Sequence, residues 1–279
     1  MLPTQQTPPL VNYYAEQWPR YVKLCVDYAN EITQFSVSEL AVIGQEDGEG
    51  KAYRGVFPQQ CENQLYDNLR KQAENIVDRL VSLATESFTP PGVTVEIKPK
   101  EFTDHFLPDK DSFLGFDPAS VWNALAEQYG GGLASETAYQ QNAGKIVSAF
   151  QIRKGQPLEI KAGAVILNLT VYIDHFDAKH FNRKNLCHSS REELCKLLAA
   201  LEAFLAWAEI DLDLPGLQRL KHRFNGPCQV NSRENIRVVN GLNIVTFQYR
   251  FEFRFSGELA DKIALFIGLY GSHAMGIAA

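Results

Sequence analysis

Histidine and aspartate side chains gather in one short segment of this 279-residue chain, directly after a run of strand-forming residues. Imidazole nitrogens and carboxylate oxygens together suit a Zn²⁺, Mn²⁺ or Fe²⁺ ion, and such an ion lowers the pKa of a bound water for hydrolysis. The segment is therefore a candidate site for a metal-dependent hydrolase or nuclease. Its candidate metal ligands are Asp174, His175, Asp177 and His180, and its candidate catalytic residues are His175, Asp177 and His180.

The alternative for this segment is a polar connection between a strand and a helix, with exposed histidines. The spacing favours this alternative, because Asp174 and His175 are adjacent and would point to opposite faces of a strand. His175 and Asp177 would share a face, and His180 would reach them only through a turn. Cys187 and His188 are also adjacent, so we do not expect them to form a nucleophile pair.

Basic side chains gather toward the C-terminus, although the net charge of −6 by itself argues against a nucleic-acid binder. Residues 1–150 carry 11 Lys+Arg and 20 Asp+Glu, whereas residues 151–279 carry 16 and 13. Guanidinium groups on a sheet face suit phosphate binding by charge and by paired hydrogen bonds. We predict a nucleic-acid-binding surface on this C-terminal basic sheet, formed by Arg219, Lys221, Arg223, Arg237, Arg250 and Arg254.

Arg250 and Arg254 flank Glu252, which would partly neutralise them on that face. The alternative for these arginines is a solvated amphipathic sheet with cross-strand pairs. Along residues 248–255 polar and aromatic side chains alternate. This period of two predicts that the aromatic residues face the core and are not base-stacking platforms. These aromatic residues are Tyr249, Phe251, Phe253 and Phe255.

The elements that must position these residues follow from the hydrophobic periodicity. We expect an extended arm over the first 12 residues, an acidic loop over 44–50, and an irregular stretch or short strand over 214–231. Strands are expected at 93–98, at 156–173 around an Ala162-Gly163 turn, and at 235–239 and 243–255 around Asn240-Gly241. Helices are expected at 18–35, 58–88, 118–129, 135–150, 189–210 and 256–270.

This order of elements predicts an α+β fold, because the regular strand–helix alternation of a parallel sheet is missing. We expect a mainly helical N-terminal half and an antiparallel sheet with packed helices in the C-terminal half. The expected domains are an acidic helical region at 1–151 and an α+β region with a C-terminal hairpin and helix at 152–279.

Several classes of site have no motif in the sequence. There is no Walker-type phosphate loop, no dinucleotide fingerprint, no nucleophile elbow, no H-E-x-x-H helix and no zinc-type Cys/His spacing. No cofactor is therefore expected. Five unpatterned cysteines favour a reducing compartment, and no stretch is apolar enough to span a membrane, so we expect a cytoplasmic protein without a membrane partner.

The C-terminal hairpin, with Arg237, Asn240-Gly241 and Asn243 followed by Asp261-Lys262-Ile263, resembles the end of an uncharacterised bacterial domain family. That family occurs on mobile elements and prophages, sometimes beside DNA methyltransferases. Residues 116–125 and the strand before residues 192–202 echo it, so the resemblance covers about 116–270. Leu242 and the longer second strand depart from its pattern. The family has no established activity, so the resemblance implies a setting and no site residues.

These observations together predict an accessory binding protein of a phage or mobile element, in a defence or counter-defence setting. Its partner would be nucleic acid at the basic sheet or a protein at the acidic N-terminal half. The competing prediction is the metal-dependent hydrolase or nuclease that uses His175, Asp177 and His180.

Overall fold

The two halves of the chain form two compact units in a computed structural model of the protein. The structure describes residues 7–46, 62–89, 93, 95–153, 159–210, 214–226 and 228–275. One unit comprises Met1–Phe88 and Ile97–Gly132, and the other comprises Thr89–Glu96 and Leu133–Ala279. The expected α+β class is confirmed, with helices in the N-terminal part and a five-stranded antiparallel sheet with packed helices in the C-terminal part.

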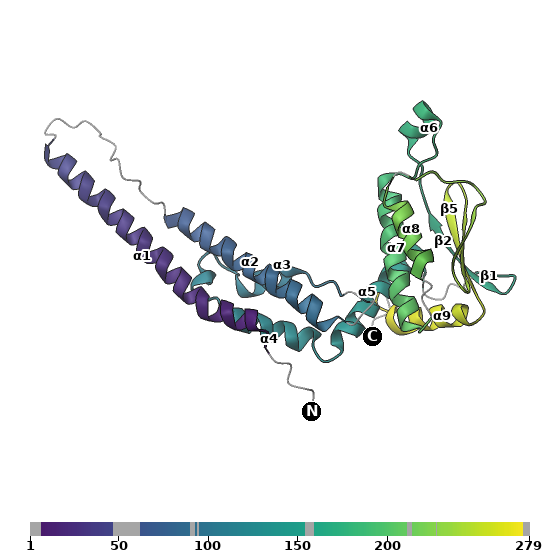
Figure 1. Ribbon diagram of the computed structural model, residues 1–279, viewed down its shortest axis with the longest axis horizontal. Coiled ribbons are helices and arrows are strands. Elements are labelled where there is room, and N and C mark those ends of the chain that lie inside the picture. The colour runs from purple at the N-terminus through teal and green to yellow at the C-terminus, as the bar shows by residue number, and fades with distance from the viewer. Residues whose placement is uncertain are drawn as a thin grey trace. The chain divides into compact units, whose positions relative to one another are not determined.

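The first unit is built on two long helices that run side by side (Figure 1). Trp18 anchors the first of these helices: it is buried, its Nε1 donates a 3.1 Å hydrogen bond to the Phe113 carbonyl, and its ring meets Phe116 edge-on at 5.7 Å. The elements of this unit are α1 (Pro9–Glu46), α2 (Glu62–Phe88), α3 (Pro99–Phe106), η1 (Ser112–Gly115) and α4 (Pro118–Tyr129).

Helix α1 is longer than the periodicity predicts, and the expected extended arm is wrong in part. The helix begins at Pro9, because proline fits the first turn, where its missing N–H has no acceptor to lose. The helix continues to Glu46, so only the end of the predicted acidic loop, residues 47–50, lies outside the described residues. Pro58, the predicted start of α2, also lies outside them.

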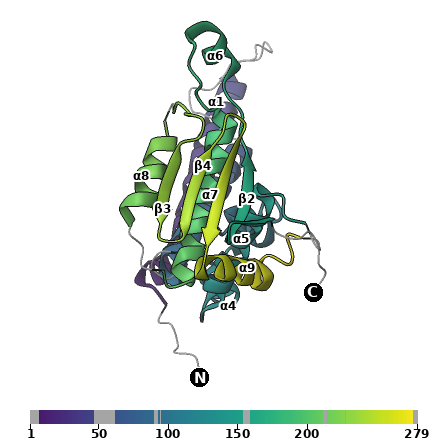
Figure 2. The same ribbon diagram turned by 90° about the vertical axis from the view of Figure 1, so that its right-hand side faces the viewer.

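The second unit places its sheet against a long helix. The strands are ordered β1-β2-β5-β4-β3, every neighbouring pair is antiparallel, and α7 covers one face of the sheet (Figure 2). The elements are α5 (Leu133–Ala149), β1 (Glu159–Lys161), β2 (Ala164–Thr170), α6 (His175–Phe181), α7 (His188–Trp207), α8 (Leu214–Phe224), β3 (Asn235–Val239), β4 (Leu242–Thr246), β5 (Arg250–Ser256) and α9 (Glu258–Tyr270).

Both predicted two-residue turns are present. Ala162 and Gly163 adopt φ of 51° and 75° between β1 and β2. Gly241 adopts φ of 85° between β3 and β4, where a side chain would meet Leu259 and the Ser256 carbonyl at 3.3 Å. Glycine is therefore required at 241 both for its backbone conformation and for the close approach of α9.

The predicted long strand at 243–255 is two strands. A tight turn over 247–249, closed by a 2.8 Å bond from the Phe247 N–H to the Arg250 carbonyl, separates β4 from β5. Phe251, Phe253 and Phe255 lie in the core as predicted, but Tyr249 does not. Tyr249 belongs to the turn and is 60% exposed, so its assignment to the core was wrong.

Two other predicted elements differ from the structure. Residues 214–224 form helix α8 where an irregular stretch or strand is expected. Residues 95–98 are extended but join no described strand, because the side-chain amide of Gln141 takes the place of a neighbouring strand. The Gln141 amide donates a 2.8 Å hydrogen bond to the Glu96 carbonyl and accepts a 2.8 Å hydrogen bond from the Glu96 N–H.

The division into units differs from the expected boundary at 151/152. Helix α5 belongs to the second unit, because Ile146 and Val147 join the core that packs under the sheet and against α7 and α9. Among the described residues, no helix is long and apolar enough to cross a membrane.

Candidate functional site

The histidine-carboxylate segment forms helix α6 and the turns beside it. Asp174 is the N-cap of this helix, and its carboxylate accepts hydrogen bonds from the Phe176 and Asp177 N–H groups at 2.9 and 3.1 Å. Asp177 accepts a 2.6 Å bond from the side-chain amide of Asn185, which is buried. Asp174 thus holds the local backbone and Asp177 holds a buried side chain, so both carboxylates act within the connection, as the alternative of a polar connection predicts.

The histidines of the segment do not converge on these carboxylates. His175 and His180 are exposed, and the His180 ring lies 4.6 Å from that of Phe176. In the part of the chain that the structure describes, no group of three or more His, Cys, Asp or Glu side chains is placed to hold a metal ion. The geometry therefore does not favour the predicted ligand set Asp174, His175, Asp177 and His180.

The basic residues of α8 are engaged within the second unit. Arg223 donates two hydrogen bonds to Glu234, at 2.7 and 2.9 Å, and Lys221 forms an ion pair with Glu202. The bond with Arg223 is the main reason that the pKa of Glu234 is lowered. Arg219 is exposed on the same helix. A phosphate would have to displace a carboxylate from Lys221 or Arg223.

The strand arginines lie together on the face of the sheet turned away from α7. Arg254 pairs in register with Asn243, and Asn243 with Arg237, so these three form one row across β5, β4 and β3. Arg250 shares this face, four residues from Arg254 on β5. The structure therefore brings Arg237, Arg250 and Arg254 together, but not with the basic residues of α8.

Glu252 neutralises two of these arginines. Glu252 is only 8% exposed. Its carboxylate accepts a 2.8 Å hydrogen bond from Arg250 and a 2.7 Å hydrogen bond from Arg254. Burial alone would raise the pKa of Glu252, but the hydrogen bonds from Arg254 and Arg250 outweigh burial and lower it. These ion pairs join residues two apart on one strand, β5, and not residues on neighbouring strands as the alternative for the arginines predicts.

Exposed apolar side chains of the first unit form a row along α1, here called the α1 stripe. Its members are 45–67% exposed and recur at helical spacing, on a face distinct from the one that buries Trp18. From its first to its last residue the row extends about 44 Å at a rise of 1.5 Å per residue. The α1 stripe consists of Tyr13, Tyr21, Leu24, Tyr28, Phe35 and Val42.

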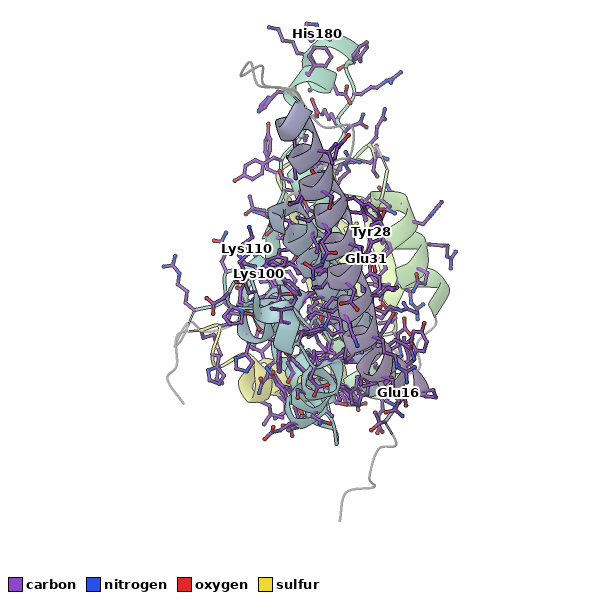
Figure 3. The ribbon with its side chains drawn as sticks, turned by 90° about the vertical axis from the view of Figure 1, so that its left-hand side faces the viewer. Glu16, Tyr28, Glu31, Lys100, Lys110 and His180 are labelled. Atoms are coloured by element: carbon purple, nitrogen blue, oxygen red, sulfur yellow. The ribbon has the colours of Figure 1, made fainter. Side chains whose placement is uncertain are left out.

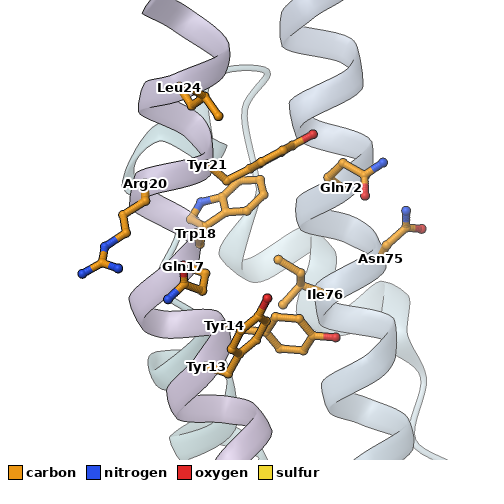
Figure 4. A pocket seen from close by; sticks show the side chains of 10 residues that line it. All are labelled: Tyr13, Tyr14, Gln17, Trp18, Arg20, Tyr21, Leu24, Gln72, Asn75 and Ile76. Carbon is orange, nitrogen blue, oxygen red and sulfur yellow. The ribbon is translucent and has the colours of Figure 1, made fainter.

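A groove of about 490 Å³ opens between α1 and α2 at the N-terminal end of this stripe. In Figure 4 the Tyr21 ring extends from α1 toward Gln72 on α2, and Arg20 points away from the groove. Ile76 is half-buried at its wall. Aromatic walls with a few amide groups suit an apolar side chain from a binding partner.

No family model, curated protein or solved structure matches the chain. A function must therefore be argued from the residues alone. Two exposed surfaces in the described residues are then the strongest candidates: the α1 stripe with its groove, and the aromatic side chains around α6.

Sequence reasoning missed both surfaces. The sequence analysis predicts a helix at 18–35 and does not separate the two apolar faces of α1. The signal is the seven-residue recurrence of aromatic and apolar side chains at 21, 28, 35 and 42, beside a separate set that buries Val11, Trp18 and Val22.

Proposed function

We propose that the chain is an accessory binding protein whose helical unit binds a partner protein through the α1 stripe. The observation that carries this proposal is the exposure of six large apolar side chains along one helix face. Single exposed apolar residues are ordinary, but large exposed apolar patches mark protein-interaction sites, and this row gathers six such residues on one face.

The spacing of the stripe suits a helix as its occupant. Side chains that recur every seven residues, such as Tyr21, Tyr28 and Phe35, pack against a second helix that crosses at a shallow angle. The groove beside Tyr21 would then receive one larger apolar side chain of the partner. This is the helix-in-groove mode of recognition.

The charge of the surroundings favours a basic partner over a second copy of this chain. The first unit has 10 Lys+Arg and 18 Asp+Glu, a net of −8. The described side chains of α1 include four carboxylates and only two cations. Two of these carboxylates, Glu16 and Glu31, lie on the same helix as Tyr28 (Figure 3). Two such units repel each other, whereas a helix with an apolar face and positive charge complements this one.

The proposal includes a phage or mobile-element setting, in defence or counter-defence. That part rests only on the resemblance of the C-terminal hairpin and residues 116–125 to a family found on such elements. It does not depend on the α1 stripe, and the genes beside the one encoding this chain test it.

A designed peptide tests the binding chemistry directly. We expect the full chain to bind a 25-residue lysine-rich amphipathic helix by isothermal titration calorimetry, with a negative heat-capacity change from apolar burial. Tyr28→Asp should weaken binding at least about tenfold, the effect of losing roughly 1.4 kcal/mol. The matched control is Leu114→Asp, since Leu114 is 55% exposed on η1 of the same unit.

Two results would contradict the proposal. One is equal binding of the designed peptide and of a scrambled peptide with the same charge but no apolar face. The other is equal loss of affinity from Tyr28→Asp and Leu114→Asp. Tyr28 is 58% exposed, so thermal unfolding of its variant should match that of the wild type and exclude misfolding as the cause.

A further inference from the structure

Helix α6 stands beyond the ends of the strands of the second unit (Figure 2). It carries exposed aromatic rings. Phe176 is 63% exposed and Phe181 is 56% exposed. Their ring centroids are 6.0 Å apart. The His180 ring lies 4.6 Å from the Phe176 ring, and the Arg183 guanidinium lies 5.7 Å from the centroid of the Phe181 ring. These four side chains, here called the aromatic tip, form one continuous row in contact with solvent.

The aromatic tip rests on a rigid base. The Asp174 cap starts the helix, and the Arg183 N–H donates to the Asp177 carbonyl at its end. Asn185 ties the base to the Asp177 carboxylate, and the Asp174 N–H donates to the Asn185 carbonyl at 2.8 Å. The rings are therefore presented by a closed hydrogen-bonded loop, so less conformational entropy is lost when a ligand binds.

Two more exposed rings lie where the neighbouring strands end. Tyr172 is 62% exposed and Tyr249 is 60% exposed. The Val171 N–H donates to the Tyr249 carbonyl at 3.0 Å, and the Cys187 N–H donates to the Tyr172 carbonyl at 2.9 Å, so both tyrosines belong to the base of the same projection. The aromatic surface therefore continues from α6 onto the end of the sheet.

The projection itself carries a positive charge. Residues 171–187 have three cations, Lys179, Arg183 and Lys184, and two carboxylates. Both carboxylates are already engaged, because Asp174 caps α6 and Asp177 holds Asn185. Arg250, at the start of β5, is paired with Glu252 and is not counted among these cations.

We propose that the aromatic tip and the adjoining strand ends bind single-stranded nucleic acid. Unpaired bases would stack on Phe176 and Phe181, and phosphates would lie against Lys179, Arg183 and Lys184. Exposed rings beside unneutralised cations are the usual means of sequence-tolerant single-strand binding. A duplex keeps its bases stacked inside and so cannot use the rings, which separates this site from a general phosphate-binding face.

Fluorescence anisotropy with the full chain tests the proposal. The probes are a labelled oligothymidylate of about 12 nucleotides and a mixed-sequence duplex of the same length, at about 50 mM salt. We expect the single strand to bind more tightly than the duplex. Phe176→Ala and Phe181→Ala should each weaken binding of the single strand at least about tenfold. Charge reversal at Lys179 and Lys184 should also weaken binding and should flatten its salt dependence.

Matched controls come from the same unit. Leu265 and Leu269 on α9 are 54% and 56% exposed, so their alanine variants should bind the single strand like the wild type, as should Lys161→Glu on β1. Equal affinity for single strand and duplex would overturn the proposal, as would unchanged binding by the two phenylalanine variants. Binding of vesicles rich in anionic lipid without any binding of the oligothymidylate would assign the projection to a lipid surface instead.

Discussion

At the scale of single residues, charged side chains in this protein mainly hold the fold together. Asp174 and Asp177 have the chemistry of metal ligands, yet one caps α6 and the other holds Asn185. Lys221 and Arg223 have the chemistry of phosphate contacts, yet each pairs with a glutamate. Residue types and spacing could predict these groups as candidates, but they could not show which partner each group finds in space.

Glu252 gives a prediction at this scale. Glu252→Gln should lower the free energy of unfolding by about 1–3 kcal/mol at pH 7, because a nearly buried oxygen loses its charge and weakens its bonds with Arg250 and Arg254. Urea unfolding measures this difference. Glu258→Gln is the control, because the Glu258 side chain is 77% exposed and its pair with Lys262 contributes little.

The pH dependence of the same variant follows from the pKa of Glu252, which is lowered in the folded state from 4.5. The ionised carboxylate therefore stabilises the fold above that value, and its contribution disappears as the pH falls through the folded-state pKa. The wild type and Glu252→Gln should consequently converge in stability in acid. A difference that persists or grows in acid would contradict the ion-pair account.

At the scale of elements, periodicity predicted most helices and strands but not their breaks. The strand at 243–255 divides because the chain reverses at 247–249, a segment that continues the alternation of polar and aromatic residues and contains no glycine or proline. Residues 95–98 have the alternation of a strand, and Val95 and Ile97 are buried as that pattern requires. Their hydrogen bonds go to a side chain, which no local pattern reveals.

Gln141 gives the prediction at this scale. Gln141→Ala should lower the free energy of unfolding by about 1 kcal/mol per lost bond, because both Glu96 backbone groups lose their partner. Gln141→Glu should be intermediate, since a carboxylate still accepts from the Glu96 N–H but cannot donate to its carbonyl. Hydrogen exchange measures the result: the Glu96 backbone amide should exchange faster in Gln141→Ala than in the wild type. Unchanged exchange in Gln141→Ala would refute this role.

At the scale of the whole molecule, charge is divided between the two units. The first unit has a net charge of −8 and the second has 17 Lys+Arg and 15 Asp+Glu, a net of +2. The sequence predicted this division and the α+β class. It could not predict the surfaces, because exposure of the α1 stripe and of the aromatic tip depends on which helix faces the cores leave uncovered.

Self-association should follow this charge. We expect the protein to sediment as a monomer at low ionic strength, because the acidic units repel each other despite the exposed α1 stripe. At about 1 M salt the repulsion is screened, and weak association should appear in the wild type but not in Tyr28→Asp. Sedimentation velocity measures both states. A stable dimer at low salt would instead assign the α1 stripe to a second copy.

Site-specific cross-linking in the native host shows whether the α1 stripe binds a partner protein. A photoreactive residue would replace Tyr28 in one strain and the equally exposed Leu114 in another. We expect the Tyr28 position to cross-link one other protein, at a basic amphipathic helix mapped by mass spectrometry, and the Leu114 position not to do so. Cross-linking only to a second copy of this chain, or equal cross-linking from both positions, would contradict this expectation.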